Sequence, residues 1–165
     1  MKFARMLRHL TMPQWRAGHL LPRRALLRIE HAIAESESRH SGQIRFAVEN
    51  ALDLHALLRG ASARERAIEV FAALRVWDTE HNNGVLIYLL LADRDVEIVT
   101  DRGIHKRVGS RAWEEICREM EAAFRQGRFE AGVLGGIARV SRYLETCFPR
   151  QAPGTNELPD RPVVL

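Results

Sequence analysis

Side chains that can bind an ion lie on either side of a predicted hairpin. His81, Asn82 and Asn83 come directly before an apolar segment, and Asp101 and His105 follow the next one. Imidazole, amide and carboxylate groups are acceptable ligands for a divalent cation, whereas the cationic residues that follow Asp101 favour an anion. Asp101 is the candidate for a catalytic carboxylate in this group.

The hairpin that positions these residues is predicted from two apolar segments. Residues 85–91 are all apolar without alternation, so this strand should be covered on both faces. With residues 93–94 at the centre of the turn, antiparallel pairing places Leu89 opposite Ile98. Extended beyond the sheet, this register brings the two histidines close together.

A purely structural interpretation of the same residues stays open. Asn and Gly tolerate positive φ, so Asn82-Asn83-Gly84 is also typical of a turn that enters a strand. The chain has no dense carboxylate cluster, no P-loop, no Gly-x-Ser-x-Gly elbow and no His-Glu-x-x-His motif. A metal or anion site, a catalytic site and a plain turn are therefore the three alternatives.

The remaining elements follow from the spacing of apolar residues. Helices are predicted over residues 22–40, 62–74, 110–127 and 129–146. The second begins with a capping box of Ser62 and Glu65 and is expected to bury Ile68 and Phe71. Alternating apolar residues predict a half-buried strand at 43–49. We expect a three-layer α/β/α sandwich, with a mixed sheet of about four strands and helices on both faces.

Composition indicates one domain between two arms. A chain of 165 residues with 46% hydrophobic and 28% charged residues fills one core. We place this domain at residues 22–148, after a basic amphipathic arm at 1–21 and before a proline-rich extended arm at 149–165.

Charge, cysteine content and the lengths of the apolar runs argue against a nucleic-acid-binding, zinc-binding, disulfide-linked, exported or membrane-spanning protein. The formal charge is +4, but most arginines alternate with acidic residues, so we expect no nucleic acid partner. Cys117 and Cys147 form neither a zinc pattern nor a disulfide framework and are expected to be free thiols. Residues 1–10 lack the apolar core of a signal peptide, and no apolar run is long enough to span a bilayer. A cytoplasmic location follows, with peripheral contact to the inner membrane as an alternative.

Both arms carry apolar residues that need a partner. In a helix drawn through residues 1–10, Phe3, Met6, Leu7 and Leu10 lie on one side, and basic residues supply charge for acidic head groups. Residues 1–12 are therefore a candidate for peripheral membrane contact, and ordering by a protein partner is equally open.

The C-terminal arm offers a second apolar contact. The residues expected to dock are Leu158, Val163, Val164 and Leu165. They can pack on their own domain or on a neighbouring chain, which makes a homo-oligomer or a protein partner the expected assembly.

The order of these features resembles the TPM domain, which occurs in thylakoid-lumen photosystem repair proteins, a nematode receptor modulator and many bacterial proteins. The residues that carry the resemblance are Trp77, 82–87, 93–95, 96–103, Trp113, Phe124, Gly127, Phe129, Gly132, Gly135 and Gly136. The resemblance implies a binding or assembly module in the maintenance of a membrane-associated complex. Its alternative is a weak, metal-dependent phosphomonoester hydrolase of acid-phosphatase type using Ca²⁺ or Mg²⁺. We prefer the module because no nucleophile or phosphate-binding motif is present.

Overall fold

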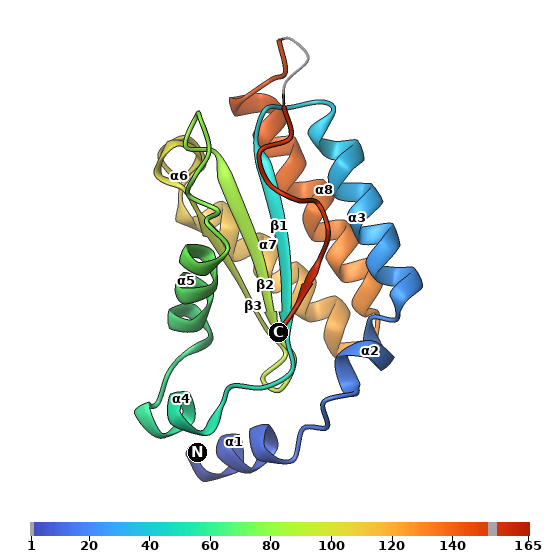
Figure 1. Ribbon diagram of the computed structural model, residues 1–165, viewed down its shortest axis with the longest axis vertical. Helices are drawn as coiled ribbons and strands as arrows, with labels where there is room; N and C mark the ends of the chain where they lie inside the picture. Colours follow the sequence, from blue (N-terminus) through green and yellow to red (C-terminus); the bar gives the residue numbers. More distant parts are fainter. Residues whose placement is uncertain (1, 152–154) are drawn as a thin grey trace.

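The computed structural model describes residues 2–151 and 155–165 (Figure 1). Met1 and residues 152–154, which belong to the two predicted arms, lie outside the described residues. The helices are α1 (Lys2–Leu10), α2 (Arg16–Leu20), α3 (Arg23–Glu37), α4 (Leu54–Arg59), α5 (Ala63–Ala73), α6 (Arg102–Val108), α7 (Ser110–Arg125) and α8 (Phe129–Cys147). The strands are β1 (Gln43–Glu49), β2 (Gly84–Leu90), β3 (Asp95–Thr100) and β4 (Val163–Val164).

The four strands form one mixed sheet in the order β3-β2-β1-β4. β1 is parallel to β2 and to β4, whereas β2 and β3 are antiparallel. The carboxyl ends of β1 and β2 therefore lie at the same end of the sheet, where α1 and α4 also lie (Figure 1). The carboxyl ends of neighbouring parallel strands are a common place for ligands in open α/β sheets.

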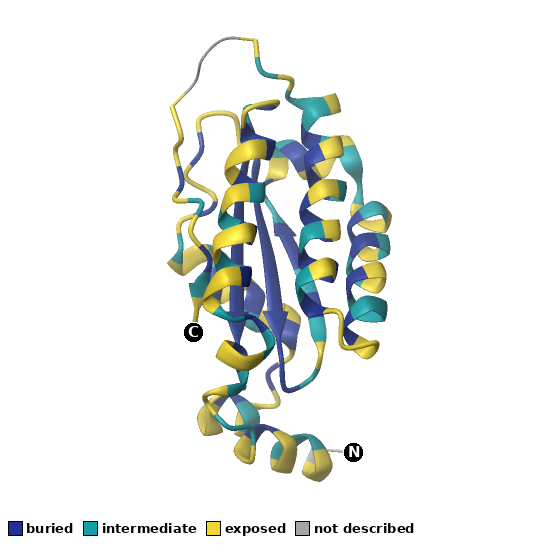
Figure 2. Ribbon diagram, turned by 90° about the vertical axis from the view of Figure 1, so that its right-hand side faces the viewer, coloured by how far each residue is buried: buried dark blue, intermediate teal, exposed yellow. Residues whose placement is uncertain are grey.

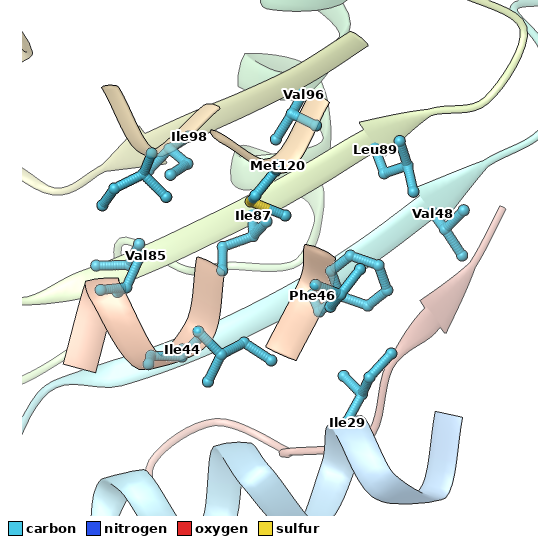
Figure 3. Close-up of a cluster of buried hydrophobic side chains, with 14 of the residues drawn as sticks. Ile29, Ile44, Phe46, Val48, Val85, Ile87, Leu89, Val96, Ile98 and Met120 are labelled. Carbon is cyan, nitrogen blue, oxygen red and sulfur yellow. The ribbon is translucent and has the colours of Figure 1, made fainter. Parts of the chain in front are cut away.

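Helices cover both faces of the sheet, so the predicted three-layer sandwich is confirmed. On one face, alternate residues of the strands pack against α3, α7 and α8, as Figure 3 shows for Phe46, Ile87 and Met120. On the other face, Leu86, Tyr88 and Leu90 pack against α4 and α5. Figure 2 shows the strands buried between these layers. This burial explains why β2 is apolar without alternation.

The register of the hairpin differs from the prediction by two residues. Leu89 pairs with Val96 and Ile87 with Ile98, because four residues, 91–94, form the turn in place of a two-residue loop. The N–H of Leu91 donates to the carbonyl of Glu49 instead of continuing the hairpin. An even shift leaves every side chain on its predicted face, since side chains alternate with a period of two.

The C-terminal arm covers the side of β1 that does not pack against α3 and α8. The prediction of a half-buried strand is wrong, because all seven residues of β1 are buried. Gln43 Oε1 accepts hydrogen bonds from the N–H groups of Glu157 (2.9 Å) and Leu158 (2.8 Å). Arg45 donates to the carbonyl of Arg161 at 3.3 Å. Gln43 and Arg45 therefore face the arm rather than water, whereas Glu49 accepts hydrogen bonds from Arg66 and Tyr88.

The apolar residues of this arm differ in exposure. Leu158 is buried, Val163 is partly buried, and Val164 and Leu165 are exposed. β4 pairs with Ala47 and Val48 of the same chain. The arm therefore lies on its own domain, and a contact between chains stays a prediction.

Helix α5 begins with the predicted capping box but buries a different stripe. Ser62 Oγ accepts from the Glu65 N–H (3.1 Å), and the Glu65 carboxylate accepts from the Ser62 N–H (2.8 Å). The expected burial of Ile68 is wrong, since half of this residue is exposed. The buried residues of α5 are Ala63, Ala67 and Val70. Small side chains allow the helix to approach the large Tyr88 on this face of the sheet.

Candidate functional site

The open end of the hairpin brings the predicted polar segments together through their backbones. The N–H of Asp101 donates to the carbonyl of Gly84 (2.9 Å), and the N–H of Ile104 donates to the carbonyl of Asn82 (3.2 Å). Asn82 has a φ of 50°, and a Cβ atom at Gly103 would lie 2.5 Å from its carbonyl oxygen. Only glycine fits this close approach.

Two of the predicted residues at this end have structural contacts. The Asn83 side-chain amide donates to the carbonyl of Ser41 (3.2 Å), and the Asn83 N–H donates to Thr79 Oγ1 (3.1 Å). Asp101 precedes α6, and its Oδ1 accepts from the Arg102 N–H at 2.6 Å. In the described part of the chain, Asn83 Oδ1 and Asp101 Oδ2 are buried without a hydrogen-bond partner.

The two histidines of the predicted site line different pockets. His81 and His105 are both exposed, as is Asn82. His81 lines a pocket of about 790 Å³ together with Arg107, Phe148 and Glu157. His105 instead lines a groove beside β3. Among residues 2–151 and 155–165, no three His, Cys, Asp or Glu side chains are grouped in a way that could hold a metal ion. Binding of Ca²⁺ or Mg²⁺ there stays a prediction.

A cationic cluster that the sequence did not reveal lies at the opposite end of the sheet. Asp93, in the turn between β2 and β3, accepts from Arg5 Nε and Arg8 Nη2, each at 2.8 Å. Arg5 also donates to the carbonyl of Ala61 (2.9 Å). Burial acts to raise the pKa of Asp93, but the hydrogen bond from Arg5 and the neighbouring positive charge outweigh it and lower this pKa.

His9 completes the attachment of α1 to the domain. Its buried Nδ1 accepts a hydrogen bond from the Leu52 N–H at 3.0 Å, which requires the proton to sit on Nε2. Nε2 lies 3.1 Å from Asp93 Oδ2 but makes no hydrogen bond to any described residue. Burial lowers the pKa of His9, which favours this neutral form.

The sequence contained one signal for this cluster. Arg8 and His9 follow Arg5 by three and four residues and therefore share one face of a helix with it. Their partner, Asp93, is more than 80 residues away along the chain, so only the fold could identify the contact.

These contacts turn the charged side of α1 toward the domain. Consequently its apolar side faces outward, with Phe3 71%, Leu7 52% and Leu10 56% exposed. Trp15, which follows α1, and Leu54 and Leu58 of α4 are also exposed. Figure 1 shows α4 at the same end of the molecule as α1. We refer to Phe3, Leu7, Leu10, Trp15, Leu54 and Leu58 as the apolar end.

Comparison with known families assigns the fold. The family model of the TPM domain matches residues 17–143. The chain belongs to the TPM-domain family. In this TPM protein, the matched region contains the hairpin, Asp93 and α4, whereas α1 precedes it and the C-terminal arm follows it.

Solved structures of similar shape agree with this assignment. The BA42 protein of the psychrophilic bacterium Bizionia argentinensis is 29% identical, with a TM-score of 0.76, and the match covers 87% of this TPM protein and 94% of BA42. The N-terminal domain of a protein from P. gingivalis is 17% identical, with a TM-score of 0.65, and the match covers 87% and 95% of the two chains. This second likeness concerns the fold alone. None of the curated proteins matches the chain.

Proposed function

We propose that this TPM domain is a binding module that attaches to an anionic membrane surface through its apolar end. The orientation of α1 carries this proposal. An amphipathic helix on a protein surface normally turns its apolar stripe toward the core. α1 does the reverse, since Arg5, Arg8 and His9 face Asp93 while Phe3 and Leu7 face outward.

The spacing of the exposed residues suits insertion at a membrane surface. Phe3, Leu7 and Leu10 follow each other at four and three residues, which places them on one stripe of the helix. Trp15 adds an aromatic ring of the kind that favours the boundary between head groups and acyl chains. Because no helix in the described residues is long and apolar enough to cross a bilayer, the proposed contact is peripheral.

Basic residues around the apolar end complement acidic head groups. Arg8, Arg59 and Arg94 have exposed side chains at this end. Arg8 is about half exposed even though it contacts Asp93. A basic side chain near an anionic leaflet contributes about 1 kcal/mol, and salt screens this attraction. The three apolar side chains of α1, Phe3, Leu7 and Leu10, give only weak binding on their own. The charge of the lipid head groups should therefore decide which membranes are bound.

Vesicle sedimentation tests the proposal. The full chain is mixed with vesicles of phosphatidylcholine, with and without phosphatidylglycerol, at low and physiological salt. We expect it to sediment with anionic vesicles at low salt, and less at higher salt. The triple substitution Phe3→Ser, Leu7→Ser and Leu10→Ser should abolish sedimentation, whereas Leu27→Ser, an exposed leucine of α3, should not.

Two outcomes would contradict the membrane proposal. One is equal recovery of the wild-type chain in the supernatant with and without anionic vesicles. The other is a dimer, seen by light scattering, that the triple substitution dissociates while vesicle binding is absent; a second copy would then cover the apolar end. Circular dichroism of each variant checks that it remains folded.

The phosphomonoester hydrolase is the second candidate, and one observation favours it. Asp101 Oδ2 is buried without a partner in the described residues, beside the exposed His81 loop. Its Oδ1, however, already caps α6. We expect hydrolysis of an aryl phosphate with Mg²⁺ or Ca²⁺ to stay at the buffer rate. If the wild-type chain turned over the aryl phosphate rapidly and Asp101→Asn abolished this activity, we would abandon the binding module in favour of the hydrolase.

A further inference from the structure

At the outer edge of β3, side chains bond the backbone groups with which a further strand could pair. β3 ends the sheet, so alternate backbone groups point away from β2. The N–H of Val96 donates to Glu121 Oε1 of α7 (3.4 Å), and the carbonyl of Ile98 accepts from Arg64 of α5 (2.6 Å). Backbone groups of an edge strand that are bonded only to side chains can pair with an extended segment when it displaces those side chains.

A groove of about 450 Å³ follows this edge. Its lining includes the carboxylates of Asp95, Glu97, Glu114 and Glu121, against the guanidinium groups of Arg64 and Arg118. Glu97 pairs with Arg64 at 3.3 Å. The groove therefore carries an excess of negative charge directly beside the outer edge of β3.

Asp95 is the least compensated of these carboxylates. Its carboxylate accepts no hydrogen bond and forms no ion pair within the described part of the chain, and the carboxylates of Glu97, Glu114 and Glu121 line the same groove. Burial raises the pKa of Asp95 to about 6, and the charges of Glu97 and Glu121 add to this effect. A cation in the groove would relieve the repulsion between these groups.

A buried donor in the lining is also without a partner. Trp113 is 4% exposed, and its Nε1–H makes no hydrogen bond to any described residue. Buried indole N–H groups are normally paired. Cys117 lies beside it as a neutral thiol, because burial raises its pKa to about 12. The groove therefore offers a donor and an apolar wall in addition to negative charge.

We propose that the outer edge of β3 binds an extended, basic segment of a partner protein. The backbone of this segment pairs with Val96 and Ile98 in place of Glu121 and Arg64. One of its lysine or arginine side chains lies against Asp95 and Glu121. This binding goes beyond membrane attachment, since the edge of β3 shares no residue with the apolar end.

The probe is a fluorescein-labelled octapeptide of alternating lysine and valine, titrated with the full chain without lipid. Fluorescence anisotropy should show saturable binding. A glutamate–valine octapeptide should bind at least about tenfold more weakly, since it repeats the charge of the groove. A lysine–valine octapeptide that is N-methylated at every residue should be weakened similarly, because it has no N–H group to donate to the carbonyls of an edge strand.

Variants locate the site. Asp95→Asn and Glu121→Gln should each weaken binding of the lysine–valine octapeptide about fivefold or more. Glu119→Gln is the matched control, because this exposed glutamate of α7 pairs with Arg139 and does not line the groove. Amide hydrogen exchange at Val96 and Ile98 should slow when the probe binds. No saturable binding, equal binding of the N-methylated probe, or unchanged exchange at these amides would overturn the proposal.

Discussion

Replacing Glu37 by glutamine should stabilise the protein at alkaline pH. Glu37 lies in the last turn of α3, is buried, and its Oε1 accepts from the N–H of Ile44 at 2.7 Å. Burial raises the pKa of Glu37 to about 8, and the nearby carboxylate of Asp160 adds to the effect. The protonated acid is therefore the form that fits this position, and a glutamine amide resembles it.

The magnitude follows from linkage between protonation and folding. The pKa of Glu37 is about 8 in the folded chain against an ordinary value of 4.5. Stability from this group is complete below about pH 4.5 and is lost as the pH rises through about 8. One pKa unit corresponds to about 1.4 kcal/mol, so the loss has an upper bound of about 5 kcal/mol. Relaxation of the C-terminal arm reduces this, and we expect Glu37→Gln to gain about 2 kcal/mol above pH 8.

Two experiments at about pH 4 and about pH 9, each followed by circular dichroism, measure this effect. Urea unfolding gives the free energy of unfolding, and thermal unfolding gives Tm. Glu37→Gln should be close to wild type at the lower pH and more stable at the higher pH, with a rise in Tm of roughly 4–8 °C. Glu35→Gln is the control, since Glu35 is exposed two residues earlier in the same helix. A difference between Glu37→Gln and wild type that does not change with pH would refute the reasoning.

Three further predictions concern the arms and α8. Leu158→Ala should lower the free energy of unfolding by about 2 kcal/mol in urea unfolding, since this leucine of the C-terminal arm is buried against the domain, whereas the exposed Leu165 should tolerate the same change. Below about pH 6.5, α1 should detach as neutral His9 takes up a proton, and faster hydrogen exchange at Leu52 measures this. Because the pKa of His9 is lowered in the folded chain, the stability that is present above about pH 6.5 is lost as the pH falls. In thermal unfolding, Gly132→Ala should destabilise by about 1–3 kcal/mol because its Cβ would lie 2.6 Å from the Phe124 ring, while Gly135→Ala, with open space around it, should stabilise by about 0.5–1 kcal/mol.

Local patterns in the sequence were enough for most of the architecture. The continuous apolar run of β2 required cover on both faces, and helices lie on both faces of the sheet. The capping box at Ser62 and Glu65 marked the start of α5, since it depends only on residues three apart. At the open end of the hairpin, the segment before β2 meets α6 through the backbones of Asn82 and Ile104, whereas a site built from the side chains there stays a prediction.

Contacts between distant segments were decided by the tertiary structure. The alternation in β1 could not show that the C-terminal arm, more than 100 residues later, covers Gln43 and Arg45. Likewise, a helical wheel showed two sides of α1 but not which side faces the domain. Asp93 decides this, because a partly buried carboxylate needs the charges and hydrogen bonds that Arg5 and Arg8 supply. The sequence by itself therefore determined the layers of this TPM domain, whereas its exposed apolar end results from an electrostatic contact that only the folded chain brings together.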